Sequence, residues 1–138
     1  MEYLTWNPTW ETGVAEIDRQ HKVLLERIDG LFQAVHGQGD AGVGEMLLFL
    51  ATYVDTHFRD EEALMERSGY PALGKHRAIH AALRSRVQQL IKEHRANPNQ
   101  VTEVVVDFLA EWLLGHIDQH DRALAQYLLA GQPRPVHP

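Results

Sequence analysis

Four long segments of the chain repeat apolar residues at intervals of three and four, and this spacing most constrains the possible fold. It is typical of amphipathic helices, whose apolar faces are stable only when they pack against one another. The expected helices span residues 18–35, 41–67, 71–95 and 100–130. Short connections favour antiparallel neighbours, so we predict an all-α fold, an antiparallel up-down-up-down four-helix bundle with an extended N-terminal arm.

The breaks between these segments carry residues that end or start helices. Asp18 is the expected N-cap of the first helix. Gly37, Gly39 and Asp40 are expected to end that helix and to supply a cap for the next. The following break reads Ser-Gly-Tyr-Pro over residues 68–71, a helix stop followed by a favoured first-turn proline.

Both ends of the chain lie outside the helical pattern. Residues 1–16 hold Tyr3, Trp6 and Trp10, which we expect to anchor the arm by packing over the core. Residues 132–138 are expected to form a flexible C-terminal tail. We therefore expect one bundle domain over residues 1–131, large enough to bury roughly two-thirds of the unfolded surface.

Composition excludes several classes of partner and site. The net charge of −6 argues against nucleic acid and anionic membrane surfaces as partners. No apolar run approaches the roughly 20 residues of a membrane span, so we expect no membrane insertion. The absence of cysteine excludes disulfides, thiolate metal sites and iron–sulfur clusters. With no apolar stretch of signal-peptide length at the N-terminus, the expected location is cytoplasmic.

Two pairs of polar residues interrupt the apolar faces of the second and third helices. His57 and Glu61 are four apart, as are His76 and His80, and residues four apart stack on one helical face. The break between the pairs makes this region a helical hairpin, in which each helix offers two metal-type ligands to the space between them. The acidic residues on either side of Glu61 lie about 100° away around the helix and are expected to face solvent.

The other two helices add further ionisable residues to their inner faces. A buried charge or unpaired imidazole costs several kcal/mol unless it is paired or bound to metal. A single histidine on an apolar face is usually a hydrogen-bonded core residue, but seven such groups on four helices favour a metal site. The predicted ligands are His21, His57, Glu61, His76, His80, His116 and Asp121.

The spacing between His116 and Asp121 leaves an alternative for the last ligand. Residues five apart on an ideal helix differ by about 140°, so both reach one site only if the helix widens locally. A π-type turn over residues 115–121 would supply this widening. The rival is His120, which stands at the regular spacing of four. Beyond His116 the apolar pattern slips by one residue, to Leu124, which favours Asp121.

The donor types restrict the metal. Five imidazoles and two carboxylates exceed the needs of a tetrahedral zinc ion and suit octahedral first-row ions, iron or manganese first. If two octahedral ions share both carboxylates and a single-oxygen bridge, these donors fill all but one of the coordination positions. Neutral imidazoles offset less of the positive charge of the metal ions than the carboxylates of other di-iron bundles do. This difference favours reversible binding at the open position over oxygen cleavage.

These residues resemble the hemerythrins, specifically the single-domain bacterial hemerythrins. The resemblance covers nearly the whole chain and rests on Gly13-Val14, Ile17-Asp18, Gln20-His21, His57-Phe58, Glu61-Glu62, Tyr70-Pro71, His76, His80, Trp112-Leu113, His116-Ile117 and Asp121. It implies a four-helix bundle that holds two iron ions in a non-haem di-iron centre with an oxo or hydroxo bridge. It also implies that Glu61 and Asp121 bridge the irons, which favours Asp121 over His120.

The resemblance further divides the ligands between the two irons. It assigns His76, His80 and His116 to one iron, and His21 and His57 to the other, which keeps the open position. Beside that position the family pattern implies an apolar dioxygen pocket, lined by Leu24, Phe58, Trp112, Leu113 and Ile117. Plain core packing is the competing explanation for these five residues. The remaining histidines are expected in solvent or near helix ends: His36, His94, His120 and His137.

The function implied by the resemblance is reversible dioxygen binding by a carrier, storage or delivery protein. On this interpretation the protein is not an enzyme, and any peroxidase-like activity is secondary. The alternatives are a di-iron redox enzyme acting on peroxide or nitric oxide, and an oxygen or redox sensor module. We expect a monomer whose partners are dioxygen and an oxygen-consuming enzyme that receives it.

Overall fold

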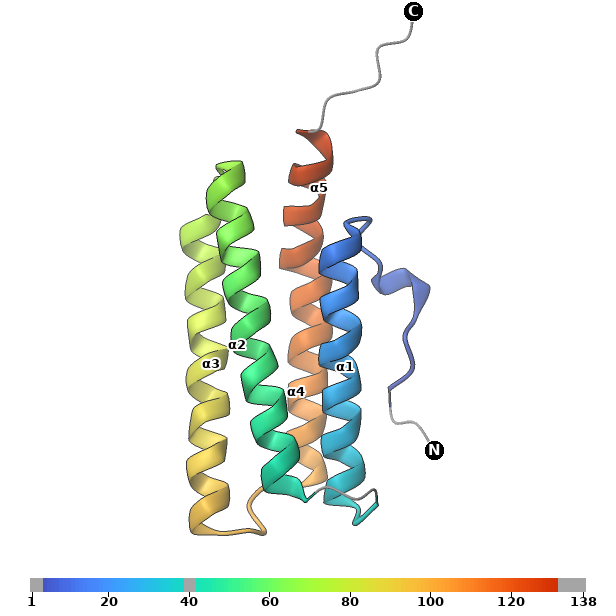
Figure 1. Cartoon of the computed structure of the whole chain (residues 1–138), viewed down its shortest axis with the longest axis vertical. Helices are drawn as coiled ribbons and strands as arrows, with labels where there is room; N and C mark the ends of the chain where they lie inside the picture. Colours follow the sequence, from blue (N-terminus) through green and yellow to red (C-terminus); the bar gives the residue numbers. More distant parts are fainter. Residues whose placement is uncertain (1–3, 39–41, 132–138) are drawn as a thin grey trace, which may run out of the picture.

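The computed structural model describes residues 4–38 and 42–131, which form helices and short irregular connections. A 3₁₀ helix, η1 (Pro8–Trp10), precedes three long α-helices, α1 (Ala15–Val35), α2 (Val43–Ser68) and α3 (Leu73–Ala96). The last rod is continuous and consists of α4 (Glu103–His116), a π-helical turn η2 (Ile117–Asp121) and α5 (Arg122–Ala130). Figure 1 shows the rods side by side and alternating in direction, with α4 and α5 in one column. The predicted all-α, up-down-up-down four-helix bundle is confirmed.

The start of the first helix differs from the prediction. Helix α1 begins at Ala15, and Val14 occupies the N-cap, so the expectation that Asp18 is the N-cap is wrong. Asp18 lies inside the helix and its carboxylate accepts hydrogen bonds from the backbone N–H and the hydroxyl of Thr12, both at 2.8 Å. Asp18 therefore fastens the preceding loop to α1 rather than capping the helix end.

The remaining boundaries fall within a few residues of those expected from the sequence. Gly37 has a φ of 69° and follows the end of α1, consistent with its predicted role as a helix stop. Gly39 and Asp40, like Tyr3 and the expected tail over 132–138, lie outside the described residues.

The α2–α3 hairpin turns at Gly69, whose φ of 67° is in the left-handed region that glycine adopts without strain. The N–H of Tyr70 bonds back to the carbonyl of Met65 at 3.0 Å, which closes the end of α2. From α5, the hydroxyl of Tyr127 donates to the carbonyls of Ser68 (2.8 Å) and Gly69 (3.2 Å). The hairpin turn is thus fixed both by its own backbone and by the last helix.

The buried apolar residues form two clusters. The smaller one contains Ile17, Met65 and Leu124 near one end of the bundle. The larger one fills the rest of the core and includes residues such as Leu24, Phe58 and Leu113. On α1, α2 and the last rod, the polar inward-facing residues stand in sequence between members of the two clusters, so a polar layer separates them.

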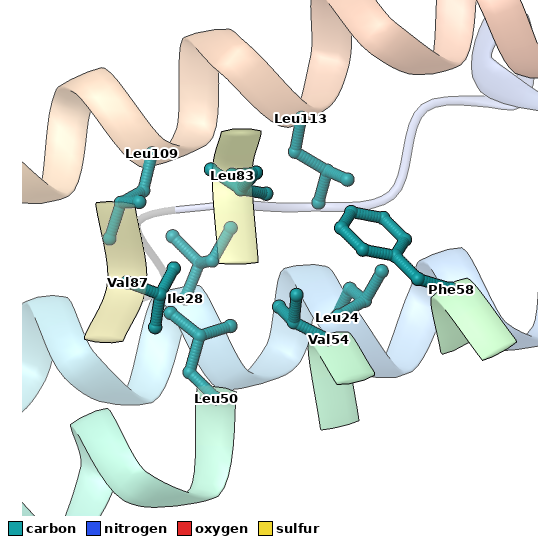
Figure 2. A pocket seen from close by; sticks show the side chains of 9 residues that line it. All are labelled: Leu24, Ile28, Leu50, Val54, Phe58, Leu83, Val87, Leu109 and Leu113. Atoms are coloured by element: carbon teal, nitrogen blue, oxygen red, sulfur yellow. The ribbon is translucent and has the colours of Figure 1, made fainter. Parts of the chain in front are cut away.

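A small cavity of about 10 Å³ lies within the larger cluster, and every side chain that lines it is apolar (Figure 2). Its lining comes from all four rods: Leu24, Ile28, Leu50, Val54, Phe58, Leu83, Val87, Leu109 and Leu113. A space of this size and character offers no hydrogen-bond partner to a water molecule.

The N-terminal arm packs along α1, and Trp6 and Trp10 are half-buried with their rings edge to face at 5.6 Å. This agrees with the anchoring role predicted for them. The guanidinium of Arg122 donates to the backbone carbonyls of Glu11 (3.0 Å) and Thr9 (2.8 Å), which ties the arm to the last rod. None of the helices in the described ranges combines the length and apolar character that crossing a membrane would require.

Candidate metal centre

The polar layer brings together all seven side chains that the sequence predicts as ligands. Each is at most 4% exposed, and they come from all four rods of the bundle. Their donor atoms fall into two groups, in each of which the atoms lie within 4.8 Å of one another. One group contains Glu61, His76, His80, His116 and Asp121, and the other contains His21, His57, Glu61 and Asp121.

The π-helical turn η2 determines which residue of the last rod enters the layer. The N–H of Arg122 bonds to the carbonyl of Ile117, the five-residue spacing of a π-helix. The wider turn lets His116 and Asp121 face the same side of the rod. Two ligands five residues apart require such local widening of the helix. His120 is half-buried and belongs to neither group, with its ring 5.2 Å from that of His116.

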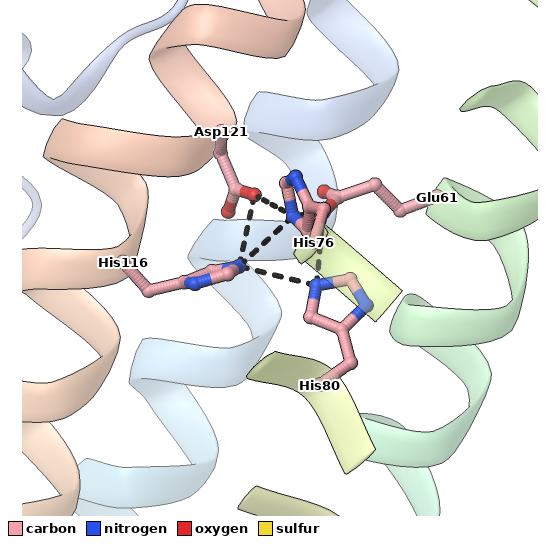
Figure 3. A group of neighbouring side chains, drawn as sticks. All are labelled: Glu61, His76, His80, His116 and Asp121. Atoms are coloured by element: carbon pink, nitrogen blue, oxygen red, sulfur yellow. Dashed lines mark hydrogen bonds and ion pairs between the residues drawn. The ribbon is translucent and has the colours of Figure 1, made fainter. Parts of the chain in front are cut away.

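In the five-residue group, three imidazoles point their Nε2 atoms at one another (Figure 3). The Nε2 of His116 lies 3.2 Å from that of His76 and 3.1 Å from that of His80. Neutral imidazoles can form at most one good hydrogen bond across these two contacts, because both share Nε2 of His116, which has either one hydrogen or one lone pair. Nitrogens about 2.1 Å from one cation and at right angles to each other lie about 3.0 Å apart, so the observed separations suit a shared metal ion.

The two carboxylates each face both groups. Glu61 directs Oε1 toward His76 (2.8 Å) and Oε2 toward His57 (3.4 Å). Asp121 directs Oδ1 toward His116 (3.1 Å) and Oδ2 toward His21 (2.8 Å). One oxygen of each carboxylate therefore serves each group, which is the arrangement needed to bridge two ions.

The same carboxylates are poorly satisfied by the protein alone. Within residues 4–38 and 42–131, neither oxygen of Glu61 or of Asp121 takes part in a hydrogen bond of good geometry, although imidazole nitrogens lie within ion-pair distance. The Nε2 atoms of His21 and His57 are in the same condition. Because leaving such groups unpaired in the core costs several kcal/mol, these residues fit bound cations.

Burial and mutual contact shift the pKa values of the metal-free residues in opposite directions. Burial lowers the pKa of His57 to about 4, against the opposing effect of Glu61. For His76, burial is outweighed by Asp121 and Glu61, which raise its pKa to about 9. Burial would raise the pKa of Asp121, but the imidazoles of His116, His21 and His76 hold it well below its ordinary value. A proton on His76 thus partly neutralises the carboxylates, and a metal ion would replace it.

Two further side chains contact the outer nitrogens of the imidazoles. Gln20 places its Oε1 2.6 Å from Nδ1 of His57, and Glu62 places its Oε2 2.9 Å from Nδ1 of His80. The expectation that both acidic neighbours of Glu61 face solvent is therefore wrong for Glu62, whose side chain is only 14% exposed. Asp60 is exposed but accepts a hydrogen bond from the Gln20 amide at 3.0 Å. Helical periodicity does not show these contacts, because they depend on how neighbouring helices are aligned.

The five residues predicted for an apolar pocket divide between two places. Leu24, Phe58 and Leu113 line the small cavity, and Phe58 also stacks on His80 with ring centroids 3.7 Å apart. Ile117 is buried but does not line the cavity. Trp112 stacks on His116 at 4.8 Å and lines an outer groove. Aromatic rings thus cover two of the candidate ligand imidazoles.

The fold and the seven side chains together define a helical-bundle protein with a buried histidine–carboxylate cluster that can hold metal ions. Residues 12–128 match the family model described as the hemerythrin HHE cation binding domain. The chain belongs to the hemerythrin family, a family of non-haem iron proteins that bind oxygen.

Individual relatives agree with this assignment. The chain is 34% identical to a bacteriohemerythrin of Pseudomonas aeruginosa, over 88% of this chain and 78% of that protein. It is 31% identical to a bacteriohemerythrin of Stenotrophomonas maltophilia, over 94% of this chain and 84% of that protein. A crystal structure of wild-type hemerythrin superposes with a TM-score of 0.83 at 29% identity, covering 91% of this chain and 98% of the other.

Proposed function

We propose that this protein binds dioxygen reversibly at a pair of non-haem iron ions and acts as a carrier, store or delivery protein. The observation that carries the proposal is the division of each buried carboxylate between two histidine groups. In the proposed centre, Glu61 and Asp121 would be shared by the two ions, together with an oxo or hydroxo bridge. Its terminal ligands are His76, His80 and His116 on one iron, and His21 and His57 on the other.

When bound, the ions supply the electrons and the open coordination position that dioxygen binding requires. The protein's own residues keep the surroundings dry and the ligands in place. Phe58 lies against His80 and, with Leu24 and Leu113, belongs to the apolar wall of the cavity next to the polar layer. Gln20 and Glu62 hold the rings of His57 and His80 by their outer nitrogens. An apolar environment of this kind limits the proton and water access that would favour irreversible oxidation.

The cavity also supports binding rather than turnover. Its lining carries no acid or base, so the space beside the polar layer offers a small apolar gas a place but offers no proton for further reaction. An oxygen-consuming enzyme is the proposed recipient of the bound gas. We place this role in the cytoplasm, a reducing compartment with which a chain without cysteine is compatible.

The test is to reduce the iron-loaded protein without oxygen, mix it with dioxygen in a stopped-flow spectrometer and then remove the gas. We expect a charge-transfer band that forms on mixing, disappears on deoxygenation and returns on a second exposure. Metal-free protein treated in the same way is the control. Immediate irreversible oxidation, or steady consumption of peroxide or nitric oxide, would instead identify a redox enzyme. A content of about one iron per chain would refute the bridged pair.

A further inference from the structure

The outer nitrogens of two candidate ligand imidazoles have partners of different charge. Nδ1 of His80 faces a carboxylate, Glu62, whereas Nδ1 of His57 faces an amide, Gln20. His80 belongs to the five-residue group and His57 to the four-residue group. The two groups therefore differ in the charge of the side chain that contacts Nδ1 of one of their imidazoles. They also differ in the number of candidate metal ligands.

Glu62 is held beside His80 by its own contacts. Nη1 of Arg84 lies 3.2 Å from the same carboxylate oxygen that His80 contacts, and Nε of Arg77 lies 3.5 Å from the other. The guanidinium of Arg84 also stands over the ring of Phe58 at 5.3 Å, and that ring stacks on His80. Glu62, Arg84 and Phe58 thus form a closed set of contacts around one imidazole. Because a carboxylate only accepts, His80 must carry its proton on Nδ1 and present a lone pair on Nε2 to the site.

Gln20 is equally well fixed, but it is neutral. Its Nε2 donates to Asp60 and to Glu16, both at 3.0 Å, so its oxygen must be the atom that faces His57. This places the proton of His57 on Nδ1 as well. The two imidazoles therefore have the same tautomer. What distinguishes them is an ionised carboxylate behind His80, itself paired with Arg84 and Arg77, and a neutral amide behind His57.

We propose that Glu62 is a positioning residue that makes the His76–His80–His116 position the tighter of the two metal positions, while Gln20 leaves the His21–His57 position the weaker. The inference rests on the proposed two-ion centre and adds an order of filling to it. A carboxylate behind a ligand imidazole raises the basicity of the ligating nitrogen and fixes the ring, and loss of such a partner typically costs ten- to a hundredfold in metal affinity. An amide fixes the ring without supplying the charge.

The test is an anaerobic titration of metal-free protein with Co(II), whose visible absorption reports the ligands of each ion as it binds. We expect two steps in the wild type, with the first ion bound at least about tenfold more tightly. Glu62→Gln should weaken the first step about tenfold and shift its absorption bands, because the amide still accepts from His80 but lacks the charge. The second step should keep its affinity and its bands. Since the replacement has the same shape and the side chain reaches the surface, the fold should be retained, as urea unfolding of the metal-free variant will show.

Glu66→Gln is the matched control. Glu66 lies one helical turn from Glu62 and contacts the same Arg77, at 2.6 Å, but it is exposed and no contact with a histidine is among its interactions in the described residues. The Glu66→Gln variant removes an equal charge from the same helix face and should leave both Co(II)-binding steps unchanged. Gln20→Met is the reciprocal variant, which should weaken the second step and spare the first.

Equal effects of Glu62→Gln and Glu66→Gln, or equal affinities of the two wild-type steps, would overturn the inference. The titration contains no dioxygen, so its result is independent of reversible oxygenation. Two Co(II) steps in a protein that oxidises irreversibly would contradict the proposed function while still deciding the role of Glu62. A single Co(II) per chain would contradict both.

Discussion

At the scale of single residues, Asp121 has the most demanding position in the centre. It is fully buried, both its oxygens face imidazoles from different helices, and it belongs to both ligand groups. The adjacent His120 is half-buried and lies in neither group. These neighbours therefore offer a direct comparison between a candidate bridging ligand and a bystander of similar polarity.

Asp121→Ala should abolish binding of the iron pair, because it removes one oxygen from each group, whereas His120→Ala should leave the iron content unchanged. Iron per chain, measured by elemental analysis after anaerobic loading, checks both expectations. Circular dichroism of the metal-free variants controls for loss of the helical fold. Full iron content in Asp121→Ala, or its loss in His120→Ala, would overturn the assignment of the last ligand.

Helical periodicity was sufficient to predict that the five histidines and Glu61 would meet, because each stands on an inward helical face and periodicity is local. Asp121 also required the slip of the apolar pattern and the family resemblance, because His120 stands at the regular spacing of four. Periodicity was not sufficient for Glu62. Its place around α2 is only about 100° from Glu61, and whether that direction means solvent or α3 depends on the rotation of one helix against the next. Asp18 was misassigned for a similar reason: a carboxylate in the first turns of a helix can cap it or bond to the preceding loop, and the loop conformation decides.

At the scale of the helical elements, η2 makes up for one extra residue in the last rod. Five residues of π-helix turn the chain through nearly the same angle as four of α-helix, so His116 and Asp121 face one side while Leu124 remains in the core. The one-residue slip of the apolar pattern revealed this element, since a regular helix would have carried Leu124 out of the core. The π-helical turn η2 is thus a bulge that keeps the residues after it on the inward face of an otherwise regular rod.

Deleting Gln119, an exposed residue of η2, should convert the bulge to regular α-helix and keep the aspartate in the site, now four residues after His116. We expect iron content to be retained and the free energy of unfolding to stay within about 1 kcal/mol of the wild type or to rise. Urea unfolding and iron analysis provide the measurements.

Deletion of the exposed Ala123 is the matched control. It removes a residue from the regular helix beyond η2 and should rotate Leu124 away from the core, at a cost of about 3 kcal/mol. Loss of iron from the Gln119 deletion with its stability intact would show that the π geometry itself, and not only its phase, is required.

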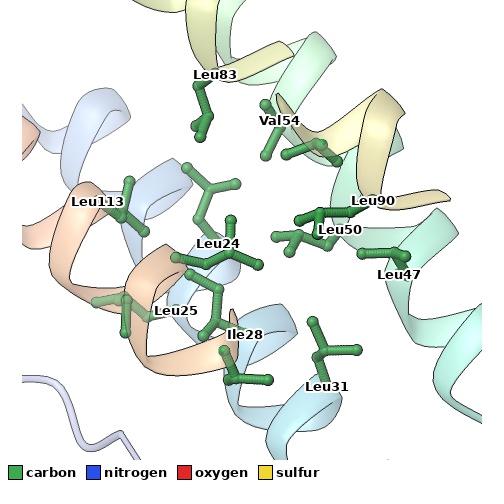
Figure 4. Packing of buried hydrophobic residues seen from close by; sticks show 14 of the residues in the cluster. Leu24, Leu25, Ile28, Leu31, Leu47, Leu50, Val54, Leu83, Leu90 and Leu113 are labelled. Carbon is green, nitrogen blue, oxygen red and sulfur yellow. The ribbon is translucent and has the colours of Figure 1, made fainter. Parts of the chain in front are cut away.

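At the scale of the whole molecule, the polar layer divides the apolar core of the bundle into two clusters. Leucines and other aliphatic residues from all four rods meet on one side of it (Figure 4). Ionisable residues at the centre of the bundle make the stability of the metal-free fold depend on pH in both directions. Metal binding changes that dependence, because the ion replaces protons on the same nitrogens.

The metal-free protein should be most stable near pH 6.5. The pKa of His57 falls from 6.5 to about 4 in the fold, so the fold favours the neutral ring and loses stability as the pH falls from 6.5 toward 4. The pKa of His76 rises from 6.5 to about 9, so its contribution is complete below 6.5 and is lost as the pH rises through 9. Each loss is on the order of 2–3 kcal/mol.

Urea unfolding of chelator-treated protein at several pH values checks this profile. The metal-loaded protein is the control and should lose the decline between pH 6.5 and 9, because a metal ion on His76 excludes the proton. A stability that remained flat over that range in the metal-free protein would contradict the favourable protonation of His76.

The contact of Arg122 with the N-terminal arm has a consequence for how the molecule opens locally. Its two hydrogen bonds, to Glu11 and Thr9, join segments more than a hundred residues apart in sequence, at the first residue of α5. Opening of α5 as far back as Arg122 therefore requires the arm to be released as well, which raises the free energy of that opening above that of an ordinary terminal helix. Amide hydrogens at the start of α5 should consequently exchange with solvent as one cooperative unit with those of the arm.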